Sequence, residues 1–330
     1  MNCIFVCRKH EGNIINIIQE NNFIVEQLVV KKSLSFNLLN FKNSFNKYVG
    51  SSIVDDAIEF LNIIKKYDAK IAIVDHYYLD FKWECIVNQS LQKLIAIDDL
   101  ANRKHNVDIL IDTNINRIQD DYKKYLLKPC KLYLGLDYFI LSNEFYNEKM
   151  KNKQKTIKSN FKNILVSFGG IDSKNLTNLT LKAISKCHFA KDLFVTVVIG
   201  SNFMWKSQLN NLLSSLNYKV KIIEETKKLA GFMNKSDLMI GAGGATSIEA
   251  LFLELPSILI VSADNQKRNV SNLNKLGVVV KIDSTEELKM RIECLRDNNK
   301  RIELMNSNIK KLKIGTHTKI ARLINDIVKI

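Results

Sequence analysis

No apolar stretch of this sequence is long enough to cross a membrane. A membrane-spanning helix needs about 18 consecutive apolar residues, and no run in the chain reaches that length. The apolar start Cys3–Cys7 is also too short for the apolar region of a signal peptide. We therefore predict a cytoplasmic protein without a membrane partner.

Cysteine and histidine are sparse, and their spacing is not that of a metal site. The six cysteines are scattered, and the one close pair, Cys3 and Cys7, has no second pair to complete a zinc site. The five histidines show no metal-ligand spacing, and we expect His10 and His105, in polar stretches, to be solvated. The sequence thus predicts buried free thiols, no metal and no cofactor.

Negative charge is in deficit, since 49 lysines and arginines face 34 aspartates and glutamates and give a net charge of +15. Clustered basic residues would indicate nucleic-acid binding, because they replace the counterions of phosphate backbones. The lysines here are spread along the whole chain among asparagines and isoleucines. We interpret the excess as a solvated surface that helps to attract an anionic ligand, and we expect no nucleic-acid partner.

The chain is too long for one typical domain. Its 330 residues correspond to two compact domains of about 150 residues each. A polar, lysine-rich segment at residues 147–160 interrupts the pattern of strands and helices. We therefore place an N-terminal domain at residues 1–147 and a C-terminal domain at residues 148–330, and we expect a monomer.

Apolar runs in the first half each end at an acidic residue. The runs are Ile71–Val74, Lys93–Ile97 and Ile109–Ile111, followed by Asp75, Asp98 and Asp112. Continuous apolar runs separated by helical stretches are typical of parallel strands covered on both faces. Since ligands bind beyond the carboxyl ends of such strands, the candidate site residues of this half are Asp75, His76, Tyr77, Asp98 and Asp99.

The second half repeats the alternation of strands and helices. Apolar runs predict strands at residues 163–168, 193–199, 220–223, 238–240, 257–261 and 278–282. Helices run between them, and we expect the last one, near Thr318–Ile330, to pack against the first half. The sequence therefore predicts an α/β protein with a parallel sheet in each half.

A pair of glycines follows the first strand of the second half. Gly169 and Gly170 stand between that strand and a helix that begins near Asn175. Glycines let the backbone approach a ligand closely, and free N–H groups at a helix N-terminus attract phosphate. Strand-to-helix turns also use glycine simply to reverse direction, so this turn alone leaves both interpretations open.

The segment at residues 241–250 is a richer version of the same pattern. Its residues of interest are Gly243, Gly244, Thr246, Ser247 and Glu249. The two hydroxyls are able to cap the helix and contact phosphate, while the carboxylate can accept both hydroxyls of a ribose. The alternative makes Glu249 only an acid that complements the helix dipole.

Amide and imidazole side chains complete the set of candidates. Asn265 and Gln266 follow a strand of the second half, so they are expected on the side of the glycine turn, although an asparagine-rich loop is also an ordinary turn. His76 and Tyr77 stand beside Asp75, where they offer a general base and a phenol that orients or binds a sugar.

Together these motifs resemble the UDP-sugar hydrolases of pseudaminic acid biosynthesis, whose fold is similar to that of MurG-type glycosyltransferases. The resemblance covers nearly the whole chain, in order, at Phe5–Leu28, Val74–Tyr77, Ile97–Arg103, Leu134–Tyr138, Ser167–Gly170, Gly241–Glu249 and Asn265–Gln266. It implies two Rossmann-like domains facing across a cleft, the GT-B architecture, with a UDP-sugar as the ligand.

The resemblance also implies a role for each matching residue. Gly169 and Gly170 would approach the diphosphate with Thr246 and Ser247 nearby, and Gly243 and Gly244 belong to the same turn. Glu249 would hold the ribose, Asn265 and Gln266 would contact the sugar or phosphates, and Tyr77 matches a tyrosine of the sugar site.

One departure concerns the catalytic base. The family begins with a strand and a Gly-x-Gly-His loop whose histidine activates water, and this chain contains neither. Met1–Phe5 aligns with the family's second strand, so we expect the first domain to lack its first strand. The nearest substitutes for the base are His76 and Asp75.

The resemblance therefore predicts a hydrolase that adds water at C1 of UDP-2,4-diacetamido-2,4,6-trideoxy-β-L-altropyranose, releases UDP and inverts the anomeric centre. A GT-B glycosyltransferase would pass the sugar to an acceptor hydroxyl instead. A non-catalytic UDP-sugar-binding remnant is the third alternative, and it follows from the absent histidine loop.

Overall fold

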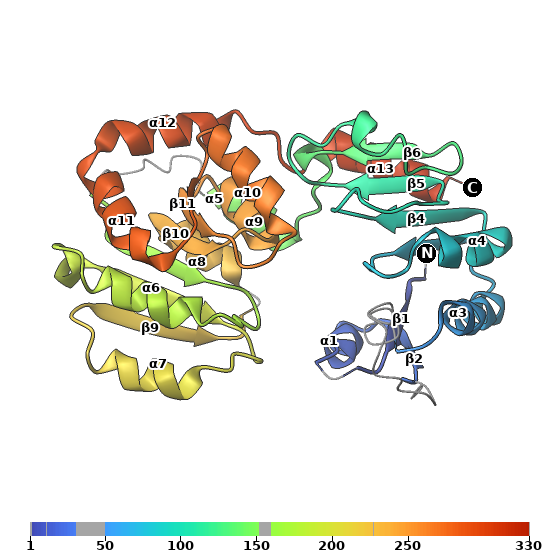
Figure 1. Ribbon diagram of the computed structural model, residues 1–330, viewed down its shortest axis with the longest axis horizontal. Helices are drawn as coiled ribbons and strands as arrows, with labels where there is room; N and C mark the ends of the chain where they lie inside the picture. Colours follow the sequence, from blue (N-terminus) through green and yellow to red (C-terminus); the bar gives the residue numbers. More distant parts are fainter. Residues whose placement is uncertain (1, 11, 31–49, 152–159, 227, 330) are drawn as a thin grey trace, which may run out of the picture. The chain divides into compact units, whose positions relative to one another are not determined.

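The structure is a computed structural model that describes residues 2–10, 12–30, 50–151, 160–226 and 228–329. It divides into two compact units (Figure 1). The first comprises Met1–Tyr138 together with His317–Ile330, and the second comprises Phe139–Thr316.

The first unit consists of parallel strands connected mainly by helices. Its elements are β1 (Ile4–Arg8), α1 (Ile15–Glu20), β2 (Ile24–Leu28), α3 (Ile53–Tyr67), β3 (Ile71–Val74), α4 (Phe81–Val87), β4 (Lys93–Ile97), β5 (Ile109–Asp112), β6 (Lys131–Leu134) and α13 (His317–Val328). Among the described residues, β1 pairs with β2 in one sheet, and the other sheet has the order β3-β4-β5-β6. The expectation that a first strand is lacking stays a prediction.

Helix α3 shows why the local sequence forms this element. The Ser52 side chain accepts the N–H of Asp55, and acidic residues in the first turn and lysines in the last complement the helix dipole. Its buried Asp56 accepts hydrogen bonds from Arg8 at 2.6 Å and from the indole of Trp83 at 2.8 Å. These bonds join β1, α3 and α4 around one core.

The last helix belongs to the first unit, as the sequence predicted. Leu323 of α13 is fully buried in a cluster with Ile95, Ile109 and Tyr133. Figure 1 shows α13, in red, beside the strands β4 to β6. The Asp326 side chain also bonds to Lys131 and Tyr133, so contacts at several points hold the end of the chain to this unit.

The second unit contains a larger sheet. Its elements are α5 (Asn143–Lys151), β7 (Asn163–Ser167), α6 (Leu176–Ile184), β8 (Phe194–Ile199), α7 (Lys206–Leu213), β9 (Lys219–Glu224), α8 (Leu229–Lys235), β10 (Leu238–Ala242), α9 (Ala245–Phe252), β11 (Ser257–Ile260), α10 (Gln266–Lys275), β12 (Val280–Ile282), α11 (Leu288–Asp297) and α12 (Asn299–Lys310). The strands are all parallel, in the order β12-β11-β10-β7-β8-β9.

That strand order contains a reversal point. The chain runs outward from β7 through β8 to β9, then returns to place β10 on the other side of β7. In open parallel sheets the connecting helices diverge at such a point, and ligands bind at the carboxyl ends of its two strands. The fold therefore singles out the turns after β7 and β10.

The unit boundary differs from the one expected after residue 147. Helix α5 packs in the second unit, where Glu144 accepts the N–H of Ala230 at 2.9 Å and Asn234 donates to Glu148 at 2.8 Å. The chain thus passes between the units at Tyr138 and Phe139, before the lysine-rich segment begins in the sequence.

The structure also bears on the predicted burial of the cysteines and on the presence of membrane-spanning helices. The cysteines are free, but Cys187 alone is buried and Cys3 is exposed, so the prediction of buried thiols was wrong for most of them. Within the described residues, no helix combines the length and apolar character needed to span a membrane.

Candidate functional site

The turns after β7 and β10 start from a point of close backbone contact. A Cβ on Gly241 would lie 2.4 Å from the Ser167 carbonyl oxygen, so only glycine fits between the two strands. The sheet order makes these strands neighbours. Both glycine turns predicted from the sequence therefore emerge side by side at the reversal point.

The turn after β7 supplies the side chain that caps the N-terminus of helix α6. Asp172 is 7% exposed, and its two carboxylate oxygens accept the N–H groups of Leu176 and Thr177, each at 2.8 Å. The indole of Trp205 donates to the Asp172 carbonyl at 2.8 Å. Asp172 therefore already occupies these two N–H groups of α6, which favours the interpretation of this turn as a structural one.

The glycines of this turn are nevertheless accessible. Gly169 has a φ of +82°, and no atom lies within 4 Å of a Cβ added at Gly169 or Gly170. A Cβ on Gly200 would lie 2.6 Å from the Gly170 Cα, so the turn after β8 packs directly against the backbone of the turn after β7. The backbone of Gly169 and Gly170 is thus fixed and exposed, with room for a ligand.

The turn after β10 leaves its helix open. Gly244 is the N-cap residue of α9, and the N–H groups of Ala245 and Thr246 make no hydrogen bond within the described part of the chain. Ser247 is fully buried, and its hydroxyl donates to the Gly244 carbonyl at 2.7 Å. The predicted capping by Thr246 and Ser247 is therefore wrong, and an acceptor is still needed at this helix end.

Helix α10 packs directly on that turn. A Cβ on Gly243 would lie 2.0 Å from Val270 Cγ2, so a larger residue cannot occupy this position. Gln266 Oε1 accepts from both the N–H and the hydroxyl of Ser262, which directs its Nε2 to within 3.8 Å of a Cβ at Gly244. The structure thus brings Gln266 beside the glycine turn, while Asn265 is exposed at the start of α10.

Glu249 lies one turn further along α9. Burial, and then the negative charge of Glu144, raise the pKa of its carboxyl above the usual range. Among the described residues it has no hydrogen bond and no ion pair. A half-buried carboxylate without a partner is costly, so this one is suited to accept hydroxyl donors from a ligand.

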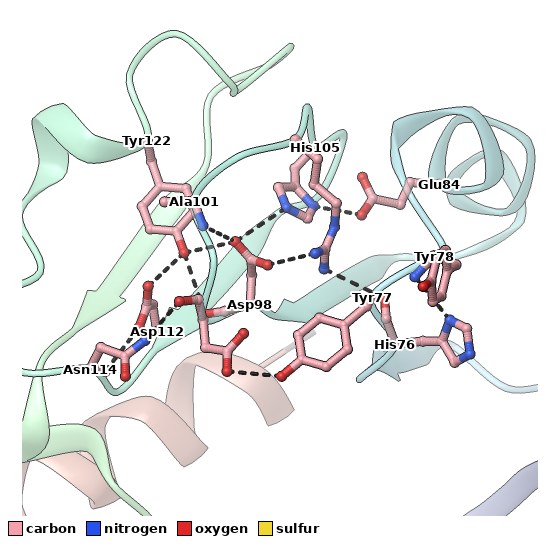
Figure 2. Close-up of polar contacts among 12 residues, drawn as sticks. His76, Tyr77, Tyr78, Glu84, Asp98, Ala101, His105, Asp112, Asn114 and Tyr122 are labelled. Atoms are coloured by element: carbon pink, nitrogen blue, oxygen red, sulfur yellow. Dashed lines mark hydrogen bonds and ion pairs between the residues drawn. The ribbon is translucent and has the colours of Figure 1, made fainter. Parts of the chain in front are cut away.

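Asp75, His76 and Tyr77 follow β3 in the first unit, as predicted; Figure 2 shows His76 and Tyr77. The Tyr77 hydroxyl donates to Asp99 Oδ2 at 2.9 Å. The Arg103 guanidinium lies 6.0 Å from the centre of the Tyr77 ring. The strand ends therefore gather a phenol, carboxylates and one cation.

His76 has no free ring nitrogen with which to accept a proton. The backbone N–H of Tyr78 donates to His76 Nδ1 at 3.1 Å. Burial is the main cause that lowers the pKa of His76, so the ring is neutral at physiological pH. Because Nδ1 accepts a hydrogen bond, the single ring proton resides on Nε2, and the ring has no free lone pair.

Asp75 is better suited to that role. Its residue is exposed, and its carboxylate has no hydrogen bond in the described part of the chain. Local desolvation and the charge of Asp99 raise the pKa of Asp75, whereas Arg103 acts in the opposite direction. A solvent-accessible carboxylate of raised pKa is a stronger base than an ordinary aspartate.

A buried ionic network supports these strand ends. His105 is 1% exposed, so the prediction of a solvated side chain was wrong. Its Nδ1 lies 2.8 Å from Glu84 Oε1 and its Nε2 lies 3.7 Å from Asp98 Oδ2. Burial opposes the charged ring, but the bonds to Asp98 and Glu84 outweigh it and raise the pKa of His105 to about 8.

Asp98 is at the centre of this network rather than in a ligand site. It is 2% exposed, and it accepts from the hydroxyl of Tyr122 at 2.9 Å while Arg103 lies 2.9 Å away. Burial would raise its pKa, but His105 and Arg103 hold it well below the usual range. The sequence marked Asp98 by its place after a strand, but no motif indicated Glu84, His105 or Tyr122.

No metal site accompanies these residues. In the ranges that the structure covers, no three histidine, cysteine, aspartate or glutamate side chains are grouped as metal ligands.

Part of the chain is similar to a known family of domains. Residues 163–323 match the model of the glycosyltransferase family 28 C-terminal domain. This match contains both glycine turns and Glu249.

The curated relatives have different activities. An uncharacterized protein of Methanocaldococcus jannaschii is 30% identical over 217 residues, 64% of this chain and 44% of that protein. UDP-2,4-diacetamido-2,4,6-trideoxy-β-L-altropyranose hydrolase of Campylobacter jejuni is 26% identical over 223 residues, 67% of this chain and 77% of the hydrolase. The spore coat polysaccharide biosynthesis protein SpsG of Bacillus subtilis is 28% identical over 171 residues, 51% of this chain and 49% of that protein. The matches to the first and third thus span less than half of those proteins.

Solved structures show the fold. MurG of Acinetobacter baumannii has a TM-score of 0.61 at 11% identity, covering 99% of this chain and 100% of that one. UDP-GlcNAc 2-epimerase of Neisseria meningitidis, bound to UDP-GlcNAc, has a TM-score of 0.61 at 14% identity, covering 100% of both chains. The predicted α/β architecture of two Rossmann-like domains, the GT-B fold, is confirmed.

Proposed function

We propose that this chain is an enzyme that acts on a UDP-sugar. In the reaction, water adds at C1 of UDP-2,4-diacetamido-2,4,6-trideoxy-β-L-altropyranose and releases UDP in pseudaminic acid biosynthesis. The observation that carries the proposal is the open N-terminus of α9, behind a glycine turn at the reversal point of the sheet. Diphosphate is the chemical group that such a helix end favours.

The diphosphate and the ribose each have a suitable partner in the second unit. The free N–H groups of Ala245 and Thr246 suit a phosphate, and the exposed backbone of Gly169 and Gly170 leaves room for the other phosphate. Glu249 has the unpartnered carboxylate that a ribose diol would satisfy.

The first unit supplies the proton acceptor in this proposal. Asp75 takes a proton from water as the water oxygen forms a bond to C1, and the bond from C1 to the diphosphate oxygen breaks with its electron pair on UDP. Direct displacement inverts the anomeric centre. His76 donates through Nε2 and does not compete as a base, because Tyr78 occupies Nδ1.

The relatives support two versions of this chemistry. The Campylobacter jejuni hydrolase, matched over 77% of its length, favours water as the acceptor. The glycosyltransferase family 28 domain and a processive diacylglycerol β-glucosyltransferase of Bacillus licheniformis, 26% identical over 195 residues, favour an acceptor hydroxyl. The base and the leaving group are the same in both versions.

The test is phosphorus NMR of UDP release from the named UDP-sugar by the full chain, without any acceptor. We expect turnover in the wild type, and at least about a 100-fold weaker UDP-sugar affinity in Glu249→Ala, which loses two charge-assisted hydrogen bonds. Glu249→Gln, which keeps one acceptor oxygen, is expected to lose less.

The other outcomes are equally informative. Turnover that requires an added acceptor would establish the transferase. Binding without turnover under either condition would identify a non-catalytic UDP-sugar binder. Failure to bind UDP or the UDP-sugar would refute the proposal.

A further inference from the structure

Tyr77 is exposed on one side and fixed on the other. Its side chain is 48% exposed, while its hydroxyl donates to Asp99 at 2.9 Å (Figure 2). The register of the sheet explains this pairing, because Val74 pairs with Ala96, and Tyr77 and Asp99 each stand three residues further along their strands. The bond therefore joins two strand ends at the same level.

The main chain of Asp99 is held firmly. Its carbonyl oxygen accepts from Asn114 Nδ2 and from Arg117 Nη2, both at 2.8 Å. The preceding residue, Asp98, is bonded to the buried hydroxyl of Tyr122. Since three partners fix this loop, Asp99 is the anchor of the pair and Tyr77 is the anchored residue.

One oxygen of the Asp99 carboxylate has no hydrogen-bond partner among the described residues. This oxygen, Oδ1, is buried. The negative charge of Asp99 raises the pKa of Asp75, whereas the positive charge of Arg103 lowers the pKa of Asp75. Asp99 thus influences both exposed neighbours without being exposed itself.

We propose that Asp99 is a positioning residue of the active site, which orients Tyr77 for contact with the sugar. This inference rests on the proposed function and deepens it, since Asp99 acts through Tyr77 and not on the substrate. The charge of Asp99 also acts on Asp75, and the two effects are separable, because the hydrogen bond needs the Tyr77 hydroxyl and the electrostatic effect does not.

The experiment compares Asp99→Asn, Tyr77→Phe and the double variant in UDP release, with kcat and KM measured from pH 4 to 8. We expect Tyr77→Phe to lose about tenfold in kcat, because it lacks a hydrogen bond to a charged group. Asp99→Asn removes the charge of that bond and also weakens Asp75 as a base, so it should lose more, and the double variant should lose no more than Asp99→Asn. Only the variants without the Asp99 charge should shift the acid limb of kcat/KM to lower pH. The reason is that Asp75 then ionises more easily.

Asp120→Asn is the matched control for the loss of one negative charge. Asp120 is exposed in the same unit and makes no hydrogen bond or ion pair among the described residues, so we expect a wild-type limb. Additive losses in the double variant would overturn the inference, and an unshifted limb in Asp99→Asn would overturn its electrostatic part. Should Asp99→Asn fail to fold, wild-type kcat in Tyr77→Phe would also overturn it.

A second measurement separates this inference from the proposed function. If the wild type binds UDP-sugar but releases no UDP, carbon-13 NMR of the Asp75 carboxyl replaces the kinetic test. A lower pKa of Asp75 in Asp99→Asn and an unchanged one in Tyr77→Phe would support the electrostatic effect even then. An unchanged titration in both variants would refute it, and failure of the wild type to bind would refute function and inference together.

Discussion

The two glycine turns of the second unit leave neighbouring strands of one sheet, yet they treat their helices in opposite ways. The turn after β7 provides its own carboxylate, and Asp172 satisfies two N–H groups of α6. The turn after β10 places Gly244 at the N-cap, and the first N–H groups of α9 have no acceptor among the residues that the structure describes. One helix end is complete without a ligand, and the other is not.

This difference shows that glycine content alone does not mark a phosphate site. Glycine provides room and conformational freedom in both turns. What distinguishes them is the presence or absence of a side chain that competes with the anion for the same N–H groups. A capping aspartate makes a helix end self-sufficient, whereas a glycine cap keeps it available.

Gly244→Asp should convert the open turn into a closed one and have the largest effect. The backbone of Gly244 has a φ of −86°, and an added Cβ would lie 3.8 Å from Gln266 Nε2, so the side chain fits. We expect UDP affinity to fall at least about 100-fold, roughly 3 kcal/mol, while the free energy of unfolding rises by up to about 1 kcal/mol. Calorimetric titration with UDP and thermal melting measure both.

Gly244→Asn is the control for that variant, because it caps the helix without a charge. It should retain more affinity than the aspartate. Unchanged UDP affinity in Gly244→Asp would show that the open end of α9 does not hold the nucleotide.

Asp172→Ala makes the reverse change and should have an intermediate effect. Two hydrogen bonds to helix N–H groups disappear, which costs about 1–3 kcal/mol of unfolding free energy. We expect a lower Tm and a UDP affinity within about twofold of the wild type, because this helix end is not available to phosphate in the native protein. Asparagine tolerates the φ of 46° at this residue, so the Tm of Asp172→Asn should lie between those of the wild type and Asp172→Ala. A large loss of UDP affinity in Asp172→Asn would contradict the conclusion that the N-terminus of α6 does not bind the nucleotide.

The pH dependence of UDP binding should be the smallest effect. Since burial and Glu144 raise the pKa of Glu249, its carboxylate is protonated at a higher pH than an ordinary glutamate. We therefore expect UDP affinity to weaken severalfold as the pH falls from 7 to 5, and Glu249→Gln to lack that decline. For folding the sign is opposite, because a raised pKa in the native state contributes stability below the unfolded pKa that is lost as the pH rises through the native one.

The sequence predicted the strands and the positions of the turns, because these are recorded in short local patterns. An apolar run followed by an acid or glycine marked β3, β4, β7 and β10. Strand β6 was not predicted from the sequence, although its three apolar residues are followed by Gly135.

The partners of the site residues were not predictable in the same way. Glu84 and His105 are 21 residues apart and meet only in the fold, and nothing in the segment around His105 distinguishes a buried ion pair from a solvated histidine. Asp172 was visible in the sequence beside Gly170, but its capping role depends on a positive φ that brings its carboxylate back onto α6.

The return of α13 to the first unit has a consequence for dissecting the protein. The chain passes between the units twice, after Tyr138 and after Thr316. The first unit is therefore built from two separate segments of the sequence. A fragment that ends at Tyr138 would lose Leu323 and uncover Ile95, Ile109 and Tyr133. Trimming the C-terminus, which in most two-domain chains harms the second domain, would here damage the first.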